Sequence, residues 1–261
     1  TNLKDTFRGL SALKSVSGLK ITNEVISLEG LFRDCTGLVS IDFSDWDTSN
    51  VTAMFYMFNN CSSFASLNLS GFDTSNVTNM RNMFYGCNSL TTIVGLENFV
   101  KGQCKDLEQM LYGCQKLTSL DLSTWNVSNV ERMSSVFADC QALTNINVSG
   151  WNLSKNKTLS YAFSDCSSLK NLDLSSWDVS RVTQFSAIFS GCTSLETVNI
   201  STWDVSSAEG EYATRYMFDK CNSLKSNPYT GIAKGHNAIS SIMLTSTTLP
   251  SELDFGGFTF G

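Results

Sequence analysis

A repeat marked by cysteines dominates the sequence. Eight of the nine cysteines recur at nearly equal intervals, and five of the seven intervals equal the step from Cys35 to Cys61. The interval from Cys87 to Cys114 is one residue longer, and that from Cys192 to Cys221 is three residues longer. The periodic cysteines are Cys35, Cys61, Cys87, Cys114, Cys140, Cys166, Cys192 and Cys221. A fixed period of about 20 to 50 residues is typical of a solenoid, in which each coil buries its apolar side chains against its neighbours.

The residues around each periodic cysteine repeat with it, and we number positions from that cysteine. Position −3 is aromatic or leucine in every repeat, and an earlier turn without cysteine fits the frame through Phe7 and Val16, which makes nine turns. Apolar residues at −10, −7, −4, −3 and 0 have the spacing of one face of a short helix. Those at +3, +6 and +8 have the spacing of a short strand with one buried face. The sequence therefore predicts an α/β solenoid of about nine turns, with a parallel β-ribbon on one face and short helices on the other.

The repeat also resembles a known family. The motif LxxLDLSxWDTSNVTNMxxMFxxC, over about residues 3–224, is similar to the BspA-like leucine-rich repeats of bacterial surface proteins, and SLTTIVGLENF fits the LxxLxL strand of leucine-rich repeats. The resemblance implies a leucine-rich-repeat solenoid, exposure on a bacterial cell, and adhesion or protein binding.

We expect a single domain in three segments. Residues 1–34 hold an N-terminal turn and the start of the repeats, residues 35–224 the regular repeats, and residues 225–261 an irregular insertion, a last strand and a cap. The last strand is expected at Ile239, Ile242 and Leu244. Terminal coils of a solenoid need covering, and the residues expected to do so are Leu249, Phe255, Phe258 and Phe260.

The cysteine column has three interpretations. Free thiols that pack as small apolar groups fit a straight column and an odd total. Disulfides would need closer β-carbons than stacked coils provide, and a metal needs ligands that converge on one point. We favour packing, because Cys104 occupies position −10, where Val77 and Val130 stand in other repeats.

The tryptophans share one column as well. All five stand at position +11, where Phe72 is the substitute. They could be platforms for sugar rings, but a position that accepts either aromatic favours the edge of the core.

Two polar rows follow the expected outward face of the strands. Position +9 is mostly serine, and position +7 carries Asp42, Asn68, Val94, Asp121, Asn147, Asp173 and Asn199. The row at +7 could hydrogen-bond a sugar or a peptide, or coordinate calcium with added waters. The alternative, which we favour, is that periodic residues serve the repeat itself, because binding hot spots are usually irregular and aromatic or rich in arginine.

The clearest irregularity is aromatic. Phe55 and Tyr56 stand in one turn and Tyr85 and Tyr112 in the next two, at expected surface positions, so they could form a patch for a partner. Val94 breaks the polar row in the same region. These four aromatics and the Asp and Asn residues at +7 are the candidate ligand-binding residues.

Charge and chemistry narrow the functions. A formal net charge of −6 argues against nucleic acid, which needs a basic surface, and no apolar run suggests membrane insertion. His236 is the only histidine, and no catalytic, cofactor or metal motif is recognised, so no enzyme and no cofactor are expected. We expect an extracellular module, part of a larger exported bacterial protein, that binds a protein or glycan of a host or neighbouring cell. The alternative is a spacer that holds another domain away from the cell wall.

Overall fold

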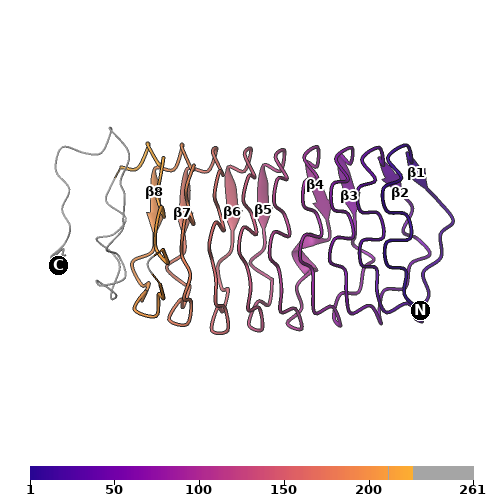
Figure 1. Cartoon of the computed structure of the whole chain (residues 1–261), viewed down its shortest axis with the longest axis horizontal. Helices are drawn as coiled ribbons and strands as arrows, with labels where there is room; N and C mark the ends of the chain where they lie inside the picture. Colours follow the sequence, from indigo (N-terminus) through magenta and orange to yellow (C-terminus); the bar gives the residue numbers. More distant parts are fainter. Residues whose placement is uncertain (211, 226–261) are drawn as a thin grey trace.

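The computed structural model describes residues 1–210 and 212–225. The chain forms one elongated stack of coils, with the N-terminus at one end of the stack (Figure 1). The regular elements are β1 (Ser15–Val16), β2 (Ser40–Ile41), β3 (Ser66–Asn68), β4 (Thr92–Val94), the 3₁₀ helix η1 (Leu96–Asn98), β5 (Ser119–Asp121), β6 (Asn145–Asn147), β7 (Asn171–Asp173) and β8 (Thr197–Asn199). This is the repeat solenoid that the sequence predicts, while the count of about nine turns stays a prediction.

The strands pair two by two instead of forming one ribbon. Parallel pairs join β1 to β2, β3 to β4, β5 to β6 and β7 to β8. Their register follows the repeat, so that Ser66 faces Thr92 and Asn171 faces Thr197. Equivalent positions of successive coils therefore lie beside one another on the strand side.

A second ladder of parallel bridges runs along the segment before each cysteine. It joins coil to coil through Asn2, Ser27, Ala53, Asn79, Asp106, Arg132, Thr158 and Gln184 in turn. Alternate amides bond to the next coil, as Phe32 N does to Met57 O at 3.0 Å. The amides between them donate to the backbone carbonyl three residues earlier in the same coil, as Arg33 N does to Gly30 O at 2.9 Å.

The helices predicted before each cysteine are wrong for the part of the chain described, where the one helical element is η1. In every repeat the residues at −5 and −1 have a left-handed backbone, for example Asn82 at φ 54° and Gly86 at φ 70°. A positive φ at the third residue of a turn is the mark of a type II turn, and L-residues do not continue an α-helix in that conformation. Successive four-residue turns thus replace the helix while keeping the apolar spacing of three and four.

The core follows the predicted columns. Val77, Met80, Met83, Phe84 and Cys87 are all buried. Phenylalanines at −3 stack from coil to coil on either side of Leu111, with ring centroids 5.3 Å apart at the first pair and 5.0 Å at the last. Burial of these rings with the other core columns stabilises the contact between successive coils, together with the two ladders.

The cysteines pack, as predicted. All nine are buried free thiols. Each thiol of the periodic column donates to the backbone carbonyl of the residue at position −3 one coil earlier, as Cys87 Sγ does to Phe58 O at 3.1 Å. Burial raises the pKa of Cys87 to about 12, which keeps it a neutral thiol.

The limits of the three sequence segments stay a prediction. The expected last strand at residues 239–244, the cap at residues 249–260 and His236 lie outside the described residues.

Candidate binding surface on the strand side

The polar residues at +7 close the turn that follows each strand. Asp121 Oδ1 accepts hydrogen bonds from Ser123 N at 3.2 Å and from Ser123 Oγ at 2.7 Å. Asn147 accepts the same two bonds from Ser149. The +9 amide donates in the same way to Asp42, Asn68, Asp173 and Asn199. One oxygen of each of these side chains is therefore used in a turn of the repeat itself, which is the role that the sequence analysis favours for this row.

The carboxylates in this row are stabilised as anions. Bonds from the Ser123 hydroxyl and amide lower the pKa of Asp121, and bonds from Ser175 do the same for Asp173. The Asn147 side chain of the next coil adds a smaller effect in the same direction on the pKa of Asp121, and Asn199 does so on the pKa of Asp173. The strand side thus carries fixed negative charges at ordinary pH.

Within the described part of the chain, three of the grooves on the strand side lie where one strand pair meets the next. The groove between β2 and β3 measures about 440 Å³, and the groove between β4 and β5 about 230 Å³. The groove over β6, β7 and β8 measures about 730 Å³ and is the largest of the three. Grooves at these places follow from the pairing of strands two by two.

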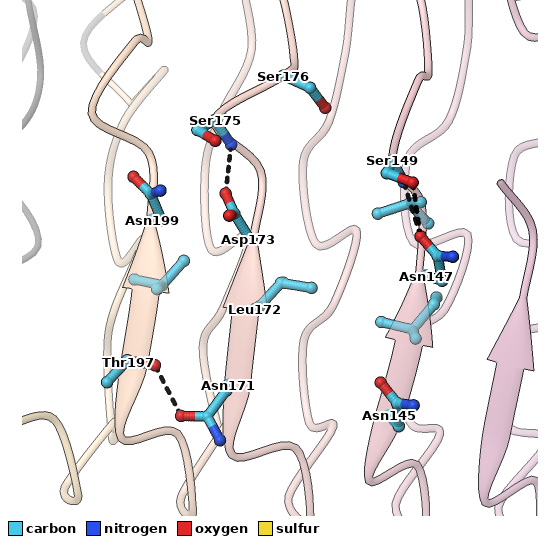
Figure 2. Close-up of a pocket in the computed structure, with 13 residues that line it drawn as sticks. Asn145, Asn147, Ser149, Asn171, Leu172, Asp173, Ser175, Ser176, Thr197 and Asn199 are labelled. Atoms are coloured by element: carbon cyan, nitrogen blue, oxygen red, sulfur yellow. Dashed lines mark hydrogen bonds between the residues drawn. The ribbon is translucent and has the colours of Figure 1, made fainter.

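The groove over β6–β8, named the β6–β8 groove below, has polar walls and an apolar floor (Figure 2). Asn145, Asn171 and Thr197, at position +5, form one wall, and Thr197 Oγ1 donates to Asn171 Oδ1 at 2.7 Å. The candidate residues Asn147, Asp173 and Asn199 form the other wall, and Ile146, Leu172 and Val198 line the floor. The structure therefore brings three of the six polar candidates together.

The wall formed by the residues at position +5 was not predicted from the sequence. Earlier coils carry Ser40, Ser66, Thr92 and Ser119 at this position. The change to asparagine at 145 and 171 was the available signal, because it departs from its own column.

The aromatic candidates form two pairs. Tyr85 and Tyr112 stack with ring centroids 4.7 Å apart and an interplanar angle of 8°. Phe55 and Tyr56 meet edge to face at 5.8 Å, and Arg33 Cζ lies 4.7 Å above the Tyr56 ring. All four rings are half-buried. Between the described residues of the two pairs no ring contact occurs, so a single patch across them stays a prediction.

The tryptophans belong to the core, as the sequence favours. Trp151 and Trp177 are 1% and 2% exposed, and their rings stack at 5.6 Å. Their indole N–H groups donate to backbone carbonyls one coil earlier, at 2.8 and 3.2 Å. Neither ring face is available to a sugar.

No three or more His, Cys, Asp or Glu side chains in residues 1–210 and 212–225 gather so that they could hold a metal ion. Over the same residues, no helix has the length and apolar character needed to cross a bilayer.

Comparison with known proteins places the chain in a family. The model of the family described as "Mycoplasma protein of unknown function, DUF285" matches residues 1–119 and 105–231, which together span most of the chain. The chain belongs to this family. No curated protein matches this DUF285 member.

Several solved structures are similar to the DUF285 chain, and they are bacterial leucine-rich repeat proteins. A leucine-rich repeat protein of T. pallidum shares 18% identity at a TM-score of 0.42, over 65% of this chain and 70% of that one. A leucine-rich repeat protein of Eubacterium ventriosum shares 16% at 0.45, over 97% and 70%. A leucine-rich cell surface protein of Faecalibacterium prausnitzii shares 17% at 0.30, over 85% and 74%. These neighbours agree with the resemblance to BspA-like repeats, while the fold assignment rests on the ladders and packing of this chain.

Proposed function

We propose that the protein is a non-catalytic binding module on the surface of a bacterial cell, and that it recognises a protein or glycan through its strand side. The observation that carries the proposal is the β6–β8 groove, which combines exposed carboxamides and a carboxylate with an apolar floor. Concave sites with an apolar lining and a few polar groups are typical of ligand binding. The repeat scaffold holds these groups at fixed spacing, which lowers the entropy lost on binding.

The surface location is part of the proposal. It is supported by the resemblance to BspA-like repeats and by a similar protein described as a leucine-rich cell surface protein. Antibody labelling of intact cells tests it: labelling before permeabilisation is expected, and labelling only after permeabilisation would contradict it.

Binding is tested with the purified chain on panels of surface proteins and glycans. The expected result is saturable binding that weakens in the variant Asp173→Ala/Asn199→Ala. The matched control is Asp42→Ala/Asn68→Ala, which changes position +7 directly after β2 and at the end of β3. Absence of binding on both panels, or equal loss in both variants, would contradict a site in the β6–β8 groove.

A structural spacer is the second candidate. It is favoured by the regular bonds between positions +7 and +9, which use part of the outward row inside the protein itself. The sequence encoded on either side of this chain separates the two roles. A large ligand-binding domain attached beyond the solenoid would favour the spacer, and its absence would favour the binding module.

A further inference from the structure

The β6–β8 groove differs from the rest of the strand side in its chemistry. Position +5 carries a hydroxyl side chain in the five earlier coils, from Ser15 to Ser119, and a carboxamide at Asn145 and Asn171. Both asparagines are exposed, as are Asp173, Thr197 and Asn199. Carboxamides at position +5 therefore gather on two adjacent coils at one place on the strand side.

Part of their hydrogen-bonding capacity is unused. Asn171 Oδ1 accepts from Thr197, and among the described residues its amide nitrogen has no acceptor. The Asn145 carboxamide has no partner at all within the described part of the chain (Figure 2). Each carboxamide offers two N–H donors and one carbonyl acceptor, so this wall of the groove presents donors and acceptors together.

The backbone adds further groups. Strands β6 and β7 both line the groove, and they belong to different pairs, β5–β6 and β7–β8. The edges that they turn toward each other therefore lack strand partners in the described structure. Unpaired strand edges carry N–H and C=O groups that water or a ligand must satisfy.

We propose that the β6–β8 groove binds an extended peptide segment of a partner protein, an inference that rests on the binding function proposed above. A carboxamide matches a peptide group, because each has a donor and an acceptor in one plane. On the floor, Ile146 and Leu172 are only 7% and 5% exposed, so the half-buried Val198 is the main apolar contact for a side chain that an extended peptide turns to one side. The paired strands β7 and β8 lie about 4.8 Å apart, and β6 stands apart from them as a member of another pair, so the groove spans at least about 10 Å, the length of about three extended residues.

The chemistry of the groove favours a peptide over a sugar. None of the described residues that line it is aromatic, and the neighbouring Trp151 and Trp177 rings are buried. A sugar therefore finds no ring on which to stack its apolar face. Asp173 and the net charge of −6 select a neutral or basic peptide.

The test is selection of peptides from a random twelve-residue display library with the purified chain. Affinities of the selected peptides are then measured by calorimetry for the wild type, for Asn145→Ala/Asn171→Ala and for the control Ser66→Ala/Thr92→Ala, which changes the same column on β3 and β4. Circular dichroism melts establish that both variants fold. We expect neutral or basic peptides whose affinity falls at least tenfold in the asparagine variant and less than twofold in the control.

Each other outcome overturns the inference in a distinct way. Peptides that bind the asparagine variant as tightly as the wild type would place the site elsewhere and leave the binding function standing. If no peptide is selected and a glycan binds in a way that depends on Asn145 and Asn171, the groove is still the binding site but its ligand is not a peptide. Absence of any peptide, protein or glycan ligand would reject the proposed function together with the inference.

Discussion

Asn156 provides the sharpest test of the packing. It stands at position −10, where Val51, Val77, Val130 and Val182 are buried in other coils. The Asn156 side chain is itself 0% exposed, and neither its Nδ2 nor its Oδ1 has a hydrogen-bond partner among the described residues. The repeat therefore places a polar group where it uses an apolar one elsewhere.

Replacing Asn156 by valine is expected to stabilise the protein. Burial of a polar group without a partner costs about 1–3 kcal/mol in proteins, and Asn156→Val removes that cost while restoring the side chain of the column. We expect the free energy of unfolding to rise by about 1–3 kcal/mol. For a chain of this size that corresponds to an increase in Tm of roughly 2–12 °C.

Thermal and urea unfolding followed by circular dichroism measure this effect. The matched control is Val130→Asn, which installs the same unpartnered group one coil earlier and is expected to destabilise by a similar amount. Equal or lower stability of Asn156→Val would refute the reasoning, because it would mean that an internal water or a rearranged neighbour already satisfies the carboxamide.

Three other properties follow from the same structure. Burial raises the pKa of Cys87 to about 12. A thiol reagent at neutral pH is therefore expected to label the cysteines of the folded protein only as fast as the protein opens. Rapid labelling of the folded state would contradict this. Hydrogen bonds from Ser123 lower the pKa of Asp121. The Asp121 carboxylate therefore contributes stability above the pKa that it has in the unfolded chain, and this contribution is lost as pH falls through its lower pKa in the folded protein. NMR titration should show that Ser123→Ala raises the pKa of Asp121, and an unchanged pKa would exclude the serine hydroxyl as the cause. Gly95 has φ 90°, and a β-carbon there would lie 2.7 Å from the Ser70 backbone, so Gly95→Ala is expected to destabilise by about 2 kcal/mol or more. Gly71→Ala, where a β-carbon meets nothing within 4 Å, is the control in the same urea titration, and equal stability of the two variants would contradict the clash.

The burial pattern was predictable because each column averages over many coils. Position −3 is phenylalanine or leucine in every repeat, and its members are buried from Phe32 to Phe218. The helix was wrongly predicted because a run of four-residue turns gives the same apolar spacing as a helix face. Position −1 held the missed signal: Asp34, Asn60 and Gly86 are residue types that tolerate a left-handed backbone.

The candidate site was only partly predictable. The outward direction of Asp121 and Asp173 follows from the strand period, and both are exposed. The grooves were not predictable, because they depend on which coils pair on the strand side, and neighbouring coils have nearly the same sequence. Asn145 and Asn171 were not predicted as site residues, because the polar rows recognised in the sequence are those at positions +7 and +9 and not the one at position +5.

Contacts between neighbouring coils test the central claim, that side chains one repeat apart in the sequence lie against one another in a continuous core. In nuclear Overhauser spectra of the folded chain, we predict cross-peaks between the rings of Trp151 and Trp177, whose centroids are 5.6 Å apart, and between Phe137 and Phe163, at 5.4 Å. Spectra in which these rings contact only residues close in the chain would contradict the solenoid and everything built on it.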